Sequence, residues 1–180
     1  MLRILNITAP DINNGNGLRV TLWVSGCTHH CKGCFNEETW DFNYGQFFSE
    51  KEEDQIIEYL KEDYIKGLSL LGGEPFEYSN QQCLLPFLRR VKAIYPDKDI
   101  WCYTGYDFET DIKEKMMVKW PETREIIRYI DILVDGEFIE DKKDLTLRFR
   151  GSSNQRIIDV PESLNKGEVV LWNQEGRITQ

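Results

Sequence analysis

The sequence predicts an α/β fold built around a mostly parallel sheet. Short apolar runs typical of buried strands alternate along the chain with segments whose apolar residues recur at helical spacing. Such an alternation implies parallel strands joined by right-handed crossovers. The chain has 180 residues, of which 41% are hydrophobic, so it can build a sizeable core. We therefore expect a single domain over residues 1–180.

Two strands are predicted before the first helix. Residues 2–7 form a short apolar run, and the polar, glycine-rich loop 13–17 follows it. Residues 18–25 alternate strictly, which predicts a strand with Arg19 on the face opposite the apolar side chains, where we expect it to be exposed. Ser49 and the glutamate three residues later have the spacing of a capping box, so a helix is expected to begin there.

The middle of the chain predicts two more strands with a helical region between them. Residues 67–71 are an apolar run bounded by glycines, typical of a strand buried on both faces, and residues 99–104 form the next strand. Ser79 has the spacing of a helix cap, and Pro86 lies inside the apolar stripe that follows. Because proline removes a backbone donor, we expect two helical pieces there.

The last third of the chain predicts one helix and three strands. Pro121 suits the first position of a helix, and the apolar run 130–134 after it predicts a strand. Residues 145–150 alternate like an exposed strand, and residues 168–172 form a last predicted strand.

Composition and charge exclude several classes of partner and location. The formal net charge of −9 and the isoelectric point near 4.8 argue against nucleic acid or an anionic membrane as the main partner. No apolar run approaches the roughly 20 residues that span a bilayer, and the N-terminus lacks the features of a signal peptide. Five cysteines, three of them bunched, do not suit a secreted disulfide framework, so we expect a cytoplasmic protein.

Three cysteines lie within eight residues, just after the strand predicted at 18–25. Cys27, Cys31 and Cys34 are separated by three and then two residues. Three thiolates this close form a metal-ligand set, and on a cubic iron–sulfur cluster they leave one iron open for chemistry. The alternative, three unrelated buried cysteines, does not predict their clustering, whereas Cys83 and Cys102 are expected to be ordinary buried side chains.

Polar or glycine-rich segments follow three predicted strands, after Ser25, Leu71 and Tyr103. In parallel sheets, ligands bind beyond the carboxyl ends of the strands. We therefore expect these segments to form one composite site.

The cysteine spacing resembles that of the radical S-adenosylmethionine superfamily, in which the three cysteines lie in a loop after the first barrel strand. Further stretches are similar to activases of glycyl radical enzymes: GNGLR (15–19), CFN (34–36), TWD (39–41), GGEP (72–75), YTGY (103–106), DILVDG (131–136) and RFRGSSNQR (148–156). The resemblance extends from about residue 4 to about residue 158. It implies an incomplete, open (β/α) barrel, since a full barrel typically needs about 250 residues.

The resemblance also implies two cofactors, a [4Fe–4S] cluster and S-adenosyl-L-methionine. Cys27, Cys31 and Cys34 would bind three irons, and the amino and carboxylate groups of S-adenosylmethionine would chelate the fourth. Residues expected to contact the cofactors are Gly33, Cys34, Phe35, Gly72, Gly73, Glu74, Thr104, Gly105 and Asp135. Glu74 would accept the ammonium group of the methionine moiety.

Several residues fall outside this scheme or depart from it. Gly33 stands where the superfamily often has an aromatic residue, and Phe35 is expected to supply apolar contact instead. His29 and His30 lie between two cysteines and are expected to tune the cluster or shape the loop. A basic patch of Arg148, Arg150 and Arg156 would dock the partner or pair with Asp141 and Asp144.

The implied activity is that of a radical S-adenosylmethionine oxidoreductase that activates another enzyme. Its partner would be the glycyl radical subunit of anaerobic ribonucleoside-triphosphate reductase, with an external one-electron reductant such as flavodoxin. One alternative is a radical S-adenosylmethionine enzyme acting on a small molecule, such as a 7-carboxy-7-deazaguanine synthase, which would turn over without a partner protein. Another is a non-enzymatic iron–sulfur electron carrier or a structural zinc module, either of which would need a fourth protein ligand.

Overall fold

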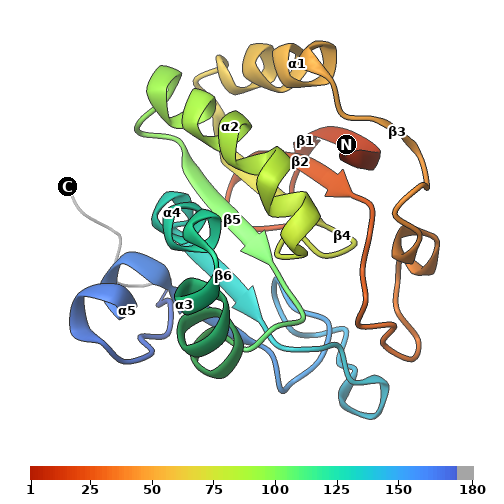
Figure 1. Cartoon of the computed structure of the whole chain (residues 1–180), viewed down its shortest axis with the longest axis vertical. Coiled ribbons are helices and arrows are strands. Elements are labelled where there is room, and N and C mark those ends of the chain that lie inside the picture. Colours follow the sequence, from red (N-terminus) through yellow and green to blue (C-terminus); the bar gives the residue numbers. More distant parts are fainter. Residues whose placement is uncertain (174–180) are drawn as a thin grey trace.

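The structure is a computed structural model of the chain, and it describes residues 1–173. These residues form a seven-stranded sheet in the order β3-β1-β2-β4-β5-β6-β7 (Figure 1). The strands are β1 (Arg3–Asp11), β2 (Leu18–Val24), β3 (Gln46–Phe47), β4 (Ile65–Gly72), β5 (Asp99–Tyr103), β6 (Ile132–Asp135) and β7 (Arg156–Asp159). The α-helices are α1 (Glu50–Leu60), α2 (Tyr78–Ile94), α3 (Met117–Lys119), α4 (Pro121–Tyr129) and α5 (Val160–Lys166). The remaining helical segments are the 3₁₀ turns η1 (Glu37–Trp40) and η3 (Glu140–Lys142) and the π-helical η2 (Phe108–Met116).

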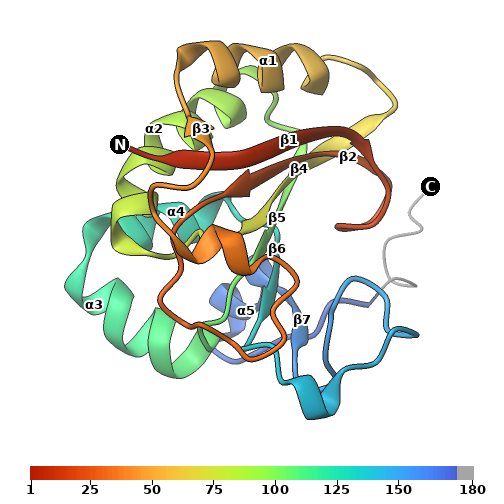
Figure 2. The same ribbon diagram turned by 90° about the vertical axis from the view of Figure 1, so that its right-hand side faces the viewer.

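The centre of the sheet is parallel, as the sequence predicts, while its edges are antiparallel. β2, β4, β5 and β6 run parallel and stand next to one another in chain order. β1, β3 and β7 pair antiparallel at the two edges. Helices α1, α2 and α4 cover one face of the sheet, whereas loops cross the other face (Figures 1 and 2). The fold is therefore α/β with a mixed sheet.

Core residues lie between the helices and the sheet. The largest cluster of buried apolar side chains joins β2 and β4 to α1, α2 and α4 through residues such as Leu22, Leu70 and Phe87. A second, smaller cluster lies on the opposite face around Trp101, with Phe149 and Trp172 packed against it edge to face. No helix in residues 1–173 is long and apolar enough to cross a lipid bilayer.

Two of the predicted helix starts are confirmed, and one predicted helix break is wrong. Ser49 and Glu52 form a capping box at α1, and Pro121 occupies the first turn of α4. However, α2 starts after Glu77 rather than Ser79 and continues through Pro86. Pro86 is exposed while residues on both sides of it pack into the core, so packing holds the helix together across the missing hydrogen bond.

The two strands predicted near the C-terminus are wrong. Residues 145–150 form turns and bends, and residues 168–172 contribute only an isolated bridge from Leu171 to Ile158. The last strand of the sheet is instead β7, which pairs with β6 and is followed by α5, with Asp159 capping that helix. Residues 145–150 do not pair with β6, because β7 already occupies that edge of the sheet.

Arg19 is buried rather than exposed, which corrects the sequence expectation. Its side chain is 0% exposed and forms a 2.6 Å ion pair with Asp99. It also donates hydrogen bonds to the Ser69 hydroxyl at 2.7 Å and to the Leu68 carbonyl at 2.8 Å. The residue therefore ties β2 to its neighbours on the face that the helices leave uncovered.

We predict that Arg19→Met lowers the free energy of unfolding by about 3 kcal/mol, because it leaves Asp99 and two further acceptors without their buried partner. Arg89→Met is the matched control, since Arg89 makes an exposed bidentate pair with Glu125. Anaerobic urea unfolding followed by circular dichroism measures both. Equal, small shifts in the two variants would contradict the structural role of Arg19.

Candidate metal centre and cofactor cleft

A cleft of about 430 Å³ opens at the carboxyl ends of the parallel strands. All three clustered cysteines line it, together with Gly73 and Glu74 after β4 and with Thr104 and Gly105 after β5. Gly136, after β6, lines the same cleft. The segments predicted to meet at one composite site therefore do so, because parallel strands end at one edge of the sheet.

Backbone hydrogen bonds hold the cysteine loop against the turn that follows it. The amide of Gly26 donates to the Thr39 carbonyl at 2.7 Å, and that of Cys27 donates to the Trp40 carbonyl at 3.2 Å. The amide of Asn36 points at the sulfur of Cys34 from 3.4 Å. These backbone hydrogen bonds anchor the start of the cysteine loop against the turn at residues 37–40.

The end of β4 packs directly on the start of the cysteine loop. The amide of Gly73 donates to the Val24 carbonyl at 2.7 Å, and that of Glu74 donates to the Gly26 carbonyl at 2.8 Å. A Cβ at Gly73 would stand 2.7 Å from the Gly26 carbonyl oxygen, so only glycine allows this approach. The side-chain amide of buried Asn80, on α2, donates to the carbonyls of Ser25 and Glu74 at 3.0 and 2.9 Å.

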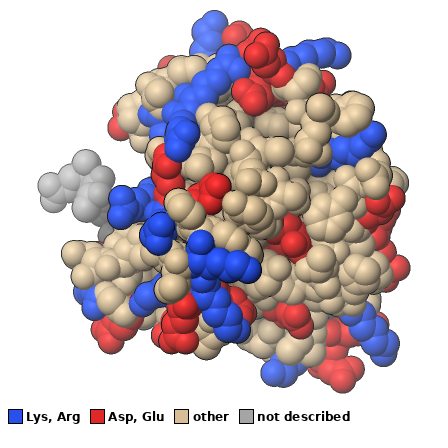
Figure 3. Space-filling model, in the orientation of Figure 1, with Lys and Arg blue, Asp and Glu red and all other residues tan. Residues whose placement is uncertain are grey.

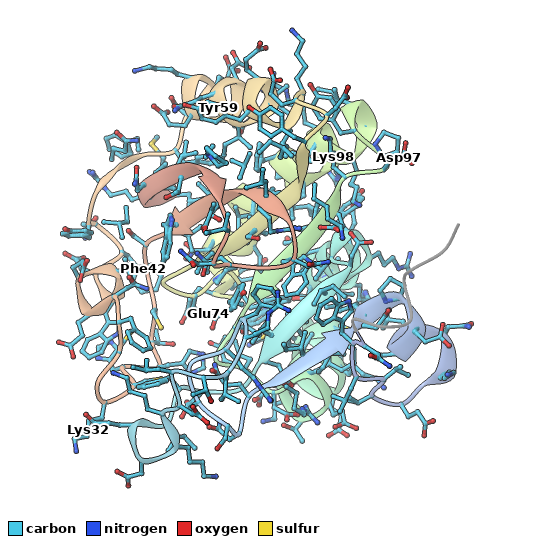
Figure 4. All side chains as sticks on the ribbon, turned by 180° about the vertical axis from the view of Figure 1, so that it is seen from behind. Lys32, Phe42, Tyr59, Glu74, Asp97 and Lys98 are labelled. Atoms are coloured by element: carbon cyan, nitrogen blue, oxygen red, sulfur yellow. The ribbon has the colours of Figure 1, made fainter. Side chains whose placement is uncertain are left out.

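The carboxylate of Glu74 is buried and joins three segments of the site. One oxygen accepts the Phe76 amide and the Thr104 hydroxyl, both at 2.8 Å. The other accepts the Gly105 amide at 2.8 Å and faces His29 Nε2 at 3.1 Å. Figure 4 shows Glu74 near the middle of the molecule and Lys32 at the outer tip of the cysteine loop.

Both histidines of the loop have defined contacts. His29 lies between Glu74 and Glu137; burial disfavours its cationic form, but the two carboxylates outweigh burial and raise the pKa of His29 to about 9. His30 stacks almost parallel on Trp40, with ring centroids 4.6 Å apart. These contacts agree with the expected role of the two histidines in shaping the loop.

The three clustered cysteines are buried or partly buried. Burial raises the pKa of Cys27 to about 12 and also raises the pKa of Cys31, so both remain protonated until metal binding displaces the proton. No three His, Cys, Asp or Glu side chains within residues 1–173 are placed to hold a single metal ion. A cubic cluster does not need thiols that converge on one point, because each thiolate binds a different iron.

Comparison with known proteins agrees with this chemistry. The 4Fe-4S single cluster domain family matches residues 13–158. The anaerobic ribonucleoside-triphosphate reductase-activating protein of Haemophilus influenzae is 48% identical over 158 residues, which cover 87% of this chain and 97% of that protein. The proteins of the same name from Pasteurella multocida and Escherichia coli K12 are 49% and 46% identical, covering 82% and 81% of this chain and 90% of each relative.

The chain belongs to this family of activating proteins. The resemblance drawn from the cysteine spacing and the GGEP stretch is thereby confirmed, as is the expectation of an iron–sulfur protein.

Most of the residues that were predicted to contact the cofactors line the cleft. The lining includes Cys34, Phe35, Gly72, Gly73, Glu74, Thr104 and Gly105. Gly33 and Asp135 do not line it. A Cβ at Gly33 would meet the Glu140 side chain at 2.9 Å, and Asp135 is buried against Arg156 and the Phe108 amide. The roles assigned to these residues remain predictions.

The arginines that were expected to form one basic patch have different partners in the structure. Arg156 pairs with Asp135, Asp107 and Glu109 rather than with Asp141 or Asp144. Arg150 donates to the Gln155 carbonyl. Lys and Arg side chains also gather over α2 and α4 on the helical face (Figure 3), where Arg89, Arg90 and Lys92 pair with acidic side chains, so the 148–156 patch is not the only one.

Two residues near the site were missed by sequence reasoning. Asn80 bridges the ends of β2 and β4, and Gln81 links α2 to Thr123 of α4 through a 2.6 Å hydrogen bond. No sequence signal distinguished Asn80, because it lies in the first turn of α2, five residues after Pro75, among the polar residues Ser79, Gln81 and Gln82.

We predict that Cys31→Ala loses the iron–sulfur cluster, because two thiolates cannot hold it. Cys83→Ala is the matched control, since Cys83 lies on α2 and does not line the cleft. Iron and sulfide analysis of anaerobically reconstituted protein should give a full cluster for the control only. A full cluster in Cys31→Ala would remove the central ligand assignment.

Proposed function

We propose that this protein activates anaerobic ribonucleoside-triphosphate reductase by generating a glycyl radical on it. One observation carries the proposal: the three cysteines, spaced as in radical S-adenosylmethionine enzymes, share one cleft with the Gly-Gly-Glu turn after β4. Membership of the activating-protein family supports the same target.

A bound, reduced [4Fe–4S] cluster would supply the one electron needed to cleave a carbon–sulfur bond of S-adenosylmethionine, which would give methionine and a 5′-deoxyadenosyl radical. Transfer of a hydrogen atom from a backbone glycine of the reductase to that radical would leave the glycyl radical and 5′-deoxyadenosine. The protein's task is to orient these groups and to exclude water.

The residues of the cleft divide this task among them. Cys27, Cys31 and Cys34 would hold three irons and would leave the fourth open to the amino and carboxylate groups of S-adenosylmethionine. Glu74 lines the same cleft and would accept the ammonium group through the oxygen that now faces His29. Thr104 and Gly105 line the cleft one strand further along and would contact the ribose.

We infer that the sheet corresponds to the incomplete, open (β/α) barrel of radical S-adenosylmethionine enzymes. β2, β4, β5 and β6 follow one another in chain order, with helices on one face only. A sheet wound in one direction is typical of barrels, whereas a doubly wound sheet carries helices on both faces. The uncovered face then corresponds to the inside of the barrel.

We predict that the reduced protein converts S-adenosylmethionine to 5′-deoxyadenosine and that Cys27→Ala does not. With the reductase present, electron paramagnetic resonance should show a glycyl radical; a flavodoxin should serve as the electron donor. Turnover of a small molecule without a glycyl signal would favour the small-molecule alternative. An intact, reduced cluster that yields no 5′-deoxyadenosine in either condition would favour an electron carrier.

We also predict that Glu74→Gln keeps its cluster but binds S-adenosylmethionine about tenfold more weakly, because the amide removes the negative charge opposite the ammonium group. Glu125→Gln is the control, since Glu125 lies on the helical face and pairs with Arg89. Anaerobic equilibrium binding measures both affinities. Unchanged affinity in Glu74→Gln would contradict the role assigned to this carboxylate.

A further inference from the structure

The segment that follows β6 packs directly on the cysteine loop. The carboxylate of Glu137 faces His29 Nδ1 at 2.9 Å, and the His29 side chain is only 9% exposed. The ring of Phe138 packs on that of Phe35, with ring centroids 5.2 Å apart. These two contacts stand on either side of the second and third cysteines, so residues 137–138 brace the part of the loop that carries both.

Two further contacts of this segment lie at the surface. Lys32, at the tip of the cysteine loop, forms a 2.9 Å ion pair with Glu140 (Figure 4), but the Lys32 side chain is 87% exposed. Lys143 lies over the Phe35 ring, 4.8 Å from its centroid. Because exposed ion pairs contribute little to stability, the buried His29 side chain and the aromatic pair provide most of the attachment.

The stretch 148–156, one of those similar to glycyl radical activases, holds the same segment from the other side. The amide of Ile139 donates to the Ser152 hydroxyl at 3.2 Å, and Ser152 is buried. The side-chain amide of Asn154 donates to the Glu137 carbonyl at 2.9 Å. The backbone of the segment is therefore fixed on both sides of its aromatic residue.

From this position the backbone amide of Phe138 reaches the sulfur of Cys31. Burial raises the pKa of Cys31, and the Phe138 amide opposes that rise because it hydrogen-bonds to the sulfur. The amide of Asn36 points at the Cys34 sulfur from 3.4 Å, and amides within the loop donate to the sulfur of Cys27. All three sulfurs therefore have backbone donors, and Cys31 receives one of its donors from a distant part of the chain.

Amide donors around the cysteine sulfurs favour the reduced state of a cluster bound there. An external one-electron donor would add one electron, which would make the net charge of the cluster more negative. Part of that charge would reside on the sulfurs, where hydrogen bonds stabilise it, so each such bond raises the reduction potential. The Phe138 amide contributes to this effect only while its segment stays attached to the cysteine loop.

We propose that residues 137–140 hold the Phe138 amide on Cys31 and thereby raise the reduction potential of the cluster. The inference rests on the proposed function, since it requires a [4Fe–4S] cluster on the three cysteines. Phe138 is a positioning residue, because it acts on the cluster through Cys31. The stretch 148–156 then serves electron uptake, since it fixes the backbone on both sides of Phe138.

Replacing the amide at position 138 by an ester, with phenyllactate in place of Phe138, removes one N–H and keeps the ring. The equilibrium constant for reduction of the reconstituted cluster should fall about three- to tenfold, the loss expected for one hydrogen bond. A tenfold fall makes the potential of a one-electron couple about 59 mV more negative. The control is the ester at Ile139, whose amide donates to Ser152. Anaerobic titration with titanium(III) citrate, followed by electron paramagnetic resonance without S-adenosylmethionine, measures both potentials.

Other outcomes would overturn the inference. Equal potentials in the wild type and the 138 ester would show that this amide does not act on the cluster, and equal shifts in the two esters would assign the effect to the segment as a whole. Loss of iron confined to the 138 ester would give the amide a role in cluster binding instead.

Failure of the proposed function has a different result. A reduced wild-type cluster that forms no 5′-deoxyadenosine would remove the proposed function, while the difference in potential between the two esters would remain. A wild type that takes up no cluster would remove both.

Discussion

The buried carboxylate of Glu74 is the interaction on which the arrangement of the cleft depends. Its four contacts reach its own turn at Phe76, the end of β5 at Thr104 and Gly105, and the cysteine loop at His29. A buried carboxylate is tolerated only when it is this fully hydrogen-bonded. The same contacts that satisfy the charge therefore bring the three segments of the site together.

Backbone and side-chain amide contacts complete this arrangement. The turn at Gly73 approaches the Gly26 carbonyl so closely that no side chain fits, and Asn80 holds the strand ends from the helical side. An iron-binding loop placed in this way can receive a cluster without rearranging the sheet. Preorganisation of this kind lowers the cost of orienting a reactive group.

The two faces of the sheet have different functions. The helical face carries the larger apolar core, while the uncovered face carries buried polar side chains. Arg19 and Asp11 are fully engaged there and stabilise the loops that cross this face. Tyr103 lines the cleft, while its hydroxyl oxygen is buried without a hydrogen-bond partner.

The sequence predicted the parallel centre of the sheet, the capping box of α1 and an iron–sulfur protein, because periodicity, caps and cysteine spacing are local properties. It could not show that Arg19 is buried, that Pro86 lies within one helix, or that β7 displaces the strand expected at 145–150. Those features depend on which distant segments pack against a residue. Tertiary structure alone decided that Asn80 and Tyr103 belong to the site and that Asp135 pairs with Arg156 outside the cleft, since each rests on partners far away in the chain.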